Sequence, residues 1–199
     1  MKNRELIITA VLLTVLLIMG CGHDGMTKKE LRAVKEVIPN IDEKDIEKIK
    51  LSDDINTKFP AIKKAFKVKN GGYYDYAFIA APVGYRGPIN IVAVIDGEQN
   101  KVTNVSIVEH DETLIYAESL TEDWFLNRFK GKGVKQYLER VILEATKPHE
   151  IVQITAATIS TQAVINGVNS AIGAYREMVL KESSQPIPLK VEELVTGVE

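Results

Sequence analysis

The order of hydrophobic and polar residues predicts a sheet in the middle of the chain. Four apolar runs with the two-residue period of strands are separated by Gly, Pro and Asn, at residues 65–69, 73–81, 89–95 and 102–109. Asp96-Gly97 and the three residues after it are typical of a hairpin turn between the last two runs. Because consecutive runs joined by short turns usually pair with each other, we expect an antiparallel meander.

Helical patterns precede the meander. Thr27 and Glu30 have the spacing of a capping box, and they begin a short predicted helix that Pro39 ends. A second helix with an acidic first turn is expected from Asp42, with its alternating Asp, Glu and Lys side chains in solvent up to residue 50. Residues 52–58 are expected to form a loop.

The chain after the meander predicts mixed structure that closes with a long helix. Aromatic residues around Phe125 have the spacing of a short helix, and strand-forming residues return at 138–143 and 151–154. A long amphipathic helix that buries one face follows, and residues 182–199, with two prolines, are expected to form a flexible tail. The apolar residues of this helix recur at steps of three and four: Val164, Val168, Ala171, Ile172, Tyr175 and Val179. The predicted fold class is therefore α+β, an antiparallel sheet with short helices and a long C-terminal helix.

Small and hydroxylated residues directly precede the long helix. The run from Thr155 to Thr161 reads Thr-Ala-Ala-Thr-Ile-Ser-Thr, and it places Thr158 just before the expected helix N-terminus. Backbone N–H groups at such an end lack intrahelical acceptors and carry partial positive charge, which stabilises a phosphate there. Thr158 is thus a candidate to carry a phosphate covalently. The alternative is that Thr158, Ser160 and Thr161 are helix-capping residues only.

The N-terminus has the layout of a bacterial lipoprotein signal. Lys2 and Arg4 precede an unbroken apolar run over residues 6–19, and Gly20 and Cys21 follow it. Cys21 is then the expected site of lipid attachment. The alternative is an uncleaved N-terminal helix that anchors the chain. Both alternatives place the globular part outside the cytoplasm, tethered to a membrane.

Composition excludes several classes of function. A net charge of −2 over 199 residues argues against nucleic acid as a partner. Cys21 is the only cysteine, so the domain has no disulfide, iron–sulfur cluster or thiolate metal site. His23, His110 and His149 lie in three separate segments, and we expect no metal site from them. The sequence also lacks the Gly-x-Ser-x-Gly and Walker patterns of hydrolases and nucleoside triphosphatases.

Residues 152–158, Val-Gln-Ile-Thr-Ala-Ala-Thr, resemble the flavin-attachment motif of the FMN-binding domain family. This family includes the G subunit of Rnf-type electron transport complexes and the C subunit of sodium-translocating NADH:quinone reductases. Its usual pattern begins with Asp and ends with the Thr that bonds the FMN phosphate, which corresponds to Thr158 here. Val152 replaces the Asp, and Ala156 stands where Gly is commoner.

Two further segments resemble the same family. The residues from Gly84 to Ile89 read Gly-Tyr-Arg-Gly-Pro-Ile, similar to a Gly-Tyr-Gly-Gly-Pro-Ile turn, and His110 begins a His-x-Glu-Thr loop. The resemblance covers most of residues 66–175. It implies these cofactor-binding residues: Gly84, Tyr85, Gly87, His110, Glu112, Thr113, Thr155, Ala156, Ala157, Thr158 and Ser160.

The resemblance implies a membrane-tethered, extracytoplasmic flavoprotein that transfers electrons through FMN bonded to Thr158. It would be an electron-transfer subunit rather than a stand-alone enzyme, with a membrane redox complex or soluble electron carriers as partners and a transferase that supplies FMN from FAD. The expected organisation is a signal or anchor at 1–21, a helical segment at 22–60, an FMN-binding domain at 61–181 and a tail. The alternatives are a flavin-free accessory domain of the same fold and a flavin reductase that binds FMN reversibly.

Overall fold

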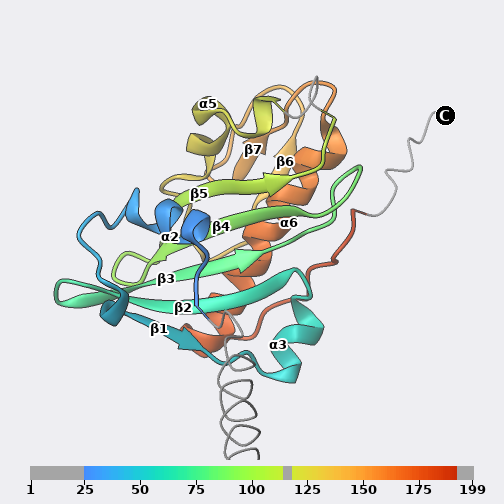
Figure 1. Cartoon of the computed structure of the whole chain (residues 1–199). Helices are drawn as coiled ribbons and strands as arrows, with labels where there is room; N and C mark the ends of the chain where they lie inside the picture. Colours follow the sequence, from blue (N-terminus) through green and yellow to red (C-terminus); the bar gives the residue numbers. More distant parts are fainter. Residues whose placement is uncertain (1–24, 114–117, 192–199) are drawn as a thin grey trace, which may run out of the picture.

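A five-stranded antiparallel sheet organises the computed structural model, which describes residues 25–113 and 118–191 (Figure 1). The strands follow in the order β1-β2-β3-β4-β5, so the predicted meander is confirmed and gains one strand at its start. The signal segment with Cys21 lies outside the described residues. The strands are β1 (Ile46–Ile49), β2 (Ile62–Asn70), β3 (Tyr73–Ala80), β4 (Ile89–Asp96) and β5 (Lys101–His110).

The long helix α6 (Thr158–Tyr175) packs across one face of this sheet (Figure 1). The prediction of a helix is confirmed, but the prediction that it buries a single face is wrong, because residues 160, 161 and 163–175 are all buried. Polar side chains on its outer side, such as Asn169, are covered by other parts of the chain rather than by water. The helix therefore forms the centre of the larger hydrophobic core.

The C-terminal segment supplies part of this cover. Residues 182–191, which the sequence assigns to a flexible tail, run along the domain in extended form (Figure 1). The Ile187 N–H donates to the Lys58 carbonyl at 2.9 Å, and the Val83 N–H donates to the Leu189 carbonyl at 2.9 Å. The second of these bonds attaches the segment directly beside the turn that begins at Gly84.

Helix α2 (Lys28–Lys35) covers the opposite face of the sheet (Figure 1). Its predicted capping box is confirmed, since the Glu30 N–H donates to Thr27 Oγ1 at 3.2 Å and the Thr27 N–H donates to Glu30 Oε2 at 2.7 Å. Val34 of this helix is fully buried against Val92 and Val94 of β4. The sheet is thus the middle layer of three.

Two predictions between α2 and β2 are wrong. The helix expected from Asp42 is a single 3-10 turn, Glu43–Asp45, followed by strand β1, because pairing with β2 supplies this segment with backbone partners. The loop expected at 52–58 contains helix α3 (Asp53–Lys58), whose Ser52 cap accepts the Ile55 N–H at 3.3 Å. Burial of Ile55 in the core stabilises this short helix.

Beyond β5 the chain forms helix α5 (Asp123–Leu126) and two short parallel strands, β6 (Glu139–Val141) and β7 (Glu150–Val152). These elements confirm the short helix and the two strand segments that the sequence predicts. Within the described ranges, no helix has both the length and the apolar character needed to cross a membrane.

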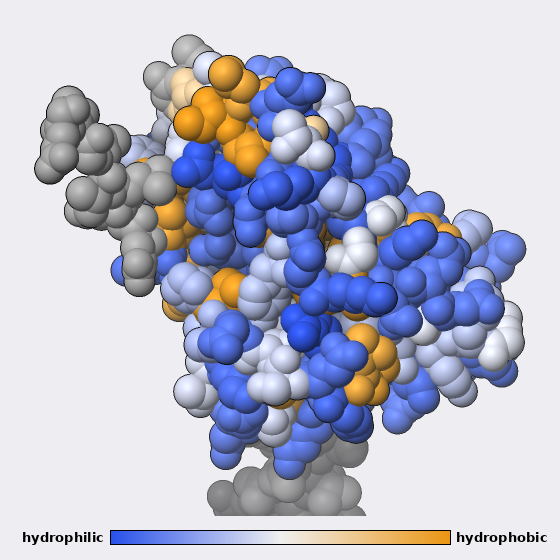
Figure 2. Space-filling model, turned by 180° about the vertical axis from the view of Figure 1, so that it is seen from behind, coloured by the Kyte–Doolittle hydropathy of each residue, from blue (hydrophilic) through white to orange (hydrophobic). Residues whose placement is uncertain are grey.

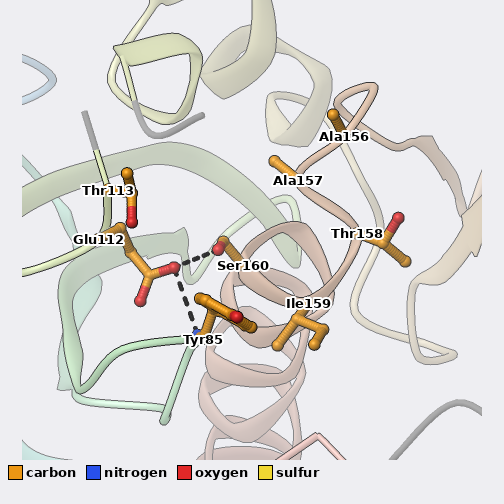
Figure 3. A pocket seen from close by; sticks show the side chains of 8 residues that line it. All are labelled: Tyr85, Glu112, Thr113, Ala156, Ala157, Thr158, Ile159 and Ser160. Carbon is orange, nitrogen blue, oxygen red and sulfur yellow. Dashed lines mark hydrogen bonds between the residues drawn. The ribbon is translucent and has the colours of Figure 1, made fainter. Parts of the chain in front are cut away.

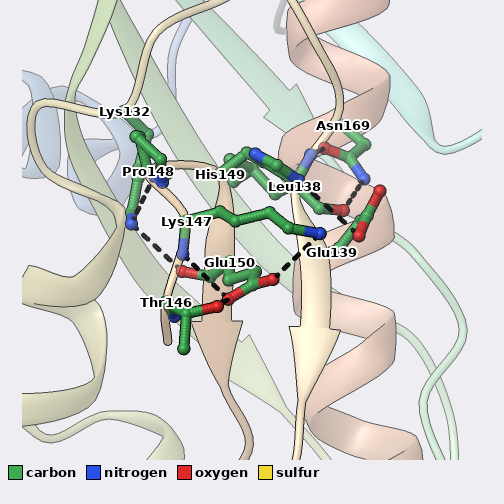
Figure 4. A network of polar contacts seen from close by, with 9 residues as sticks. All are labelled: Lys132, Leu138, Glu139, Thr146, Lys147, Pro148, His149, Glu150 and Asn169. Carbon is green, nitrogen blue, oxygen red and sulfur yellow. Dashed lines mark hydrogen bonds and ion pairs between the residues drawn. The ribbon is translucent and has the colours of Figure 1, made fainter. Parts of the chain in front are cut away.

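Polar contacts fix the β6–β7 pair to the rest of the domain (Figure 4). The Asn169 side chain of α6 bonds both the N–H and the carbonyl of Leu138, at 2.8 and 2.9 Å. Lys132 Nζ donates to the Glu150 carbonyl at 3.0 Å. The backbone N–H groups of Thr146 and Lys147 donate to the Glu150 carboxylate and hold the pKa of Glu150 below its usual value. Since β7 leads into residues 153–157, this network also positions the segment before α6.

Candidate functional site

A cavity of about 300 Å³ lies at the N-terminus of α6 (Figure 3). Three segments that are distant in the sequence meet there: the turn before β4, the residues after β5 and the start of α6. The residues that line the cavity are Tyr85, Glu112, Thr113, Ala156, Ala157, Thr158, Ile159 and Ser160.

Seven of these eight residues are among those that the resemblance implies. The exception is Ile159, which sequence reasoning missed because an apolar residue in the first turn of an amphipathic helix has the pattern of a core residue. Gly84, Gly87, His110 and Thr155 do not line the cavity but adjoin the segments that form it. Gly84 donates its N–H to the Gly87 carbonyl at 2.8 Å and so closes the turn.

The Glu112 carboxylate joins the three segments. It accepts the Tyr85 N–H at 3.3 Å and the Ser160 hydroxyl (Figure 3). It also accepts the Arg86 N–H at 2.8 Å. A side chain at Gly84 would place a Cβ 2.8 Å from Glu112 Oε1, so only glycine permits this close approach. The buried carboxylate is thereby surrounded by donors, as a buried charge must be.

His110 and Arg86 have local roles around this carboxylate. The Glu112 N–H donates to His110 Nδ1 at 3.2 Å, which orients the loop after β5. Arg86 stands where the related turn usually has glycine, but its φ is not positive, so the turn has no need of glycine there. Its backbone contributes to the site, while the residue is exposed.

The start of α6 is open to a ligand. Ala157 is the N-cap residue, and no side chain caps the helix. The Ser160 hydroxyl donates to Glu112, and Thr161 Oγ1 accepts the Ile154 N–H at 3.2 Å, so the alternative in which these residues cap the helix is wrong. In the described part of the chain, the Thr158 hydroxyl has no hydrogen-bond partner. Thr158 is itself the first helical residue, rather than the residue just before the helix.

The chain before Thr158 contains a strained residue. Ala156 has a φ of 63°, in the left-handed region that costs a residue with a Cβ about 1–2 kcal/mol. Gly is commoner at this position of the related motif, and the conformation explains that preference. This left-handed conformation of Ala156 turns the chain sharply between β7 and α6, and the turn determines where the helix begins.

We expect Ala156→Gly to stabilise the protein by about 0.5–1 kcal/mol, because the strain that it relieves exceeds the entropy that glycine loses on folding. Urea unfolding of the purified full-length chain measures this gain. Ala157→Gly is the matched control, since Ala157 has a φ of −122° and a buried methyl group. That control should destabilise, and a loss of stability in both variants would contradict the argument from strain.

The surface near the cavity carries exposed apolar side chains. Seen from behind, the molecule is mostly hydrophilic, with an apolar patch at its upper end (Figure 2). Ile142 and Leu143, which follow β6, are 66% and 88% exposed, and Tyr85 on the cavity is 70% exposed. Val141 accepts the Gln153 N–H at 2.8 Å, so Ile142 and Leu143 lie beside the segment that leads to Thr158.

Comparison with known proteins agrees with this geometry. The profile of the FMN-binding domain family matches residues 84–173, from the turn at the cavity to the last turns of α6. This part of the chain is therefore similar to the FMN-binding domain family, and the resemblance seen in the sequence is confirmed.

Individual relatives give the same result. The chain is 26% identical over 179 residues to the G subunit of the Na⁺-translocating ferredoxin:NAD⁺ oxidoreductase complex of Acetobacterium woodii, over 85% of this chain and 84% of that protein. It is 32% identical over 97 residues to the G subunit of the proton-translocating ferredoxin:NAD⁺ oxidoreductase complex of Clostridium ljungdahlii, over 49% of this chain and about half (51%) of that one. The crystal structure of the C subunit of Na⁺-translocating NADH-quinone reductase from Parabacteroides distasonis shares the fold, with a TM-score of 0.52 and 16% identity over 74% of this chain and 83% of that one.

Proposed function

We propose that this chain is a membrane-tethered, extracytoplasmic electron-transfer protein whose FMN is bonded through its phosphate to Thr158. The observation that carries the proposal is the position of Thr158, an unpartnered hydroxyl at an uncapped helix start beside a cavity. A bound phosphate would accept the free N–H groups of the first helical turn and be stabilised by their partial positive charge.

The cavity residues fit a flavin. Apolar atoms of Ala156, Ala157, Ile159 and Tyr85 offer surface for a flat aromatic ring, and the Glu112 carboxylate is already held by its own donors. A volume of about 300 Å³ is at the lower end for a ligand pocket, so part of the cofactor would stay accessible. FMN accepts one or two electrons, and the protein positions it and excludes water from one side.

Attachment requires a separate transferase that uses FAD. The Thr158 oxygen forms a bond to the phosphorus of the FMN half, the pyrophosphate bond of FAD breaks, and AMP leaves. The threonine proton passes to a base of the transferase. No electrons are exchanged in this step, so it needs no other reactant.

The relatives suggest the partner. The two G subunits are named as parts of ion-translocating ferredoxin:NAD⁺ oxidoreductase complexes, and the structural neighbour as part of a Na⁺-translocating quinone reductase. We therefore propose that this chain belongs to a membrane redox complex, in which it passes electrons and does not turn over a substrate alone. Soluble electron carriers remain the second candidate partners.

Denaturation of the purified full-length chain tests the proposal. Protein exported together with a flavin transferase should give a fluorescent band on a denaturing gel, with a mass increase of one FMN minus water. Flavin that leaves on denaturation would favour a reversible flavin reductase instead. A protein that never holds flavin would favour an accessory domain, and Val152 in place of the usual Asp is the observation behind that second candidate.

We further propose that Cys21 carries the membrane tether. Mature protein should begin at Cys21 and partition into detergent, because two acyl chains contribute roughly 0.8 kcal/mol per buried CH₂. Cys21→Ser should abolish both the processing and the lipid, as intact-mass spectrometry and detergent partitioning will measure. Retention of residues 1–20 in the native protein would establish an uncleaved anchor instead.

A further inference from the structure

Arg140 is a cation held by two glutamines, one on each side of the proposed attachment residue in the sequence. It is the middle residue of β6, and its Nε donates to Gln162 Oε1 at 3.0 Å. A second guanidinium N–H donates to Gln153 Oε1. Gln162 lies one helical turn after Thr158 on the same side of α6, and Gln153 lies in the segment that leads to it. The two amides that hold Arg140 therefore stand on either side of Thr158 in the sequence.

The charge of Arg140 has no counter-ion in the described part of the chain. Both of its hydrogen-bond partners are neutral amide oxygens, although the side chain is half-buried. Two other partly buried cations of the domain are paired with carboxylates, Lys64 with Glu30 and Lys58 with Glu177, both at 3.0 Å. Arg128 and Lys132 donate instead to backbone carbonyls. A half-buried guanidinium lowers the stability of the folded protein unless an anion pairs with it.

Gln162 also fixes the orientation of the Arg140 side chain. The Gln162 Nε2 group donates to Asn166 Oδ1 at 2.9 Å, which fixes the amide with its oxygen toward Arg140. A guanidinium has five N–H donors, and two are used within the part of the chain that the structure describes, which leaves three for another acceptor. Planar guanidinium groups match phosphate oxygens better than other side chains do.

We propose that Arg140 is a phosphate-binding residue, which pairs with the phosphate that Thr158 carries. The inference rests on the proposed attachment at Thr158 and adds to it the cation that recognises the flavin phosphate. The Gln153 and Gln162 amides orient the guanidinium, and the N–H groups at the start of α6 supply the remaining donors. Arg140 has no place in the related motifs, because it lies in a different segment from all of them.

Labelling kinetics and phosphorus NMR of the full-length protein test this inference. Arg140→Gln should lower the initial rate of flavin attachment roughly tenfold, the effect of one lost charge-assisted contact. It should also move the ³¹P resonance of the phosphodiester in protein that does become loaded. Arg140→Lys should recover part of the rate because it keeps the charge.

Arg128→Gln is the matched control. Arg128 is a second cation near the site, but its guanidinium donates to the Val152 carbonyl and lies 4.7 Å from the Trp124 ring centroid. This variant should leave the ³¹P resonance in place. If Arg128→Gln moves the resonance and Arg140→Gln does not, the phosphate contact is assigned to the wrong arginine.

The inference can also be tested on the unmutated chain, so that the result does not depend on whether a variant folds. The ¹⁵Nε resonance of Arg140 should differ between protein expressed with and without the transferase. An unchanged resonance in loaded protein, or equal labelling of the wild type and Arg140→Gln, would overturn the role of Arg140 alone. A wild type that takes no covalent flavin would overturn the attachment itself, and the pairing with it.

Discussion

Thr158→Ala protein produced with a flavin transferase should show no fluorescence after denaturation, whereas the wild type should be labelled. The change removes the oxygen to which the phosphate is proposed to bond, so the expected effect is complete loss. It should cost little stability, because in the described structure the Thr158 hydroxyl bonds to no other group and the residue is partly exposed. Gel fluorescence and the intact mass of the denatured chain measure the outcome together.

Neighbouring hydroxyl groups provide the controls for this prediction. Thr155→Ala should keep the label, since Thr155 is exposed and outside the cavity. Thr161→Ala should also keep it, because that hydroxyl is committed to the Ile154 N–H. Fluorescence that survives in Thr158→Ala would move the attachment to Thr155, Ser160 or Thr161.

Val152 offers a gain-of-function control. It stands where the related motif has Asp, so Val152→Asp should raise the labelled fraction if recognition by the transferase limits attachment. The side chain lies at the end of β7, and its carbonyl accepts a bond from Arg128 that the substitution leaves intact. An unchanged fraction would mean that the transferase tolerates valine here.

The sheet was predictable because its signal is local. Strands β2 to β5 combine apolar runs with turn residues at their ends, and Asp96 uses its carboxylate to accept the Glu98 and Gln99 N–H groups of the hairpin turn. The capping box of α2 is likewise a contact over three residues. Such features depend little on the rest of the chain.

The elements that the sequence did not predict correctly depend on contacts with residues that are distant in the sequence. Strand β1 is charged and short, and only its pairing with β2 makes it a strand. The outer side of α6 is polar enough to predict exposure, yet Asn169 finds both groups of Leu138 and is buried. The extended course of residues 182–191 likewise rests on bonds to Lys58 and Val83, more than a hundred residues earlier.

At the candidate site, too, features formed by contiguous residues were predictable and features formed by distant residues were not. The attachment segment was recognisable because its residues are contiguous. The bridging role of Glu112 was not, since it joins residues 26 and 48 positions away. The strain at Ala156 and the position of Arg140 between two glutamines also follow only from the folded backbone.

Glu112→Ala should cause a large loss of stability, about 3 kcal/mol. The change removes hydrogen bonds from the Arg86 and Tyr85 N–H groups and from the Ser160 hydroxyl to a buried carboxylate. Bonds to a charged acceptor contribute about 1.5–3 kcal/mol each, and their sum is reduced because the exposed turn can find water. Urea unfolding of the full-length chain measures the loss.

The same variant should also lower flavin labelling, because the turn at Tyr85 would no longer be held against α6. Glu112→Gln keeps one acceptor oxygen and should lose about half as much stability, and Ser160→Ala, which removes one of the three bonds, about 1 kcal/mol. A double-mutant cycle between Glu112→Ala and Ser160→Ala should then show coupling, since both changes remove the same bond. Additive losses, or a Glu112→Ala protein as stable as the wild type, would mean that the carboxylate does not hold the three segments together.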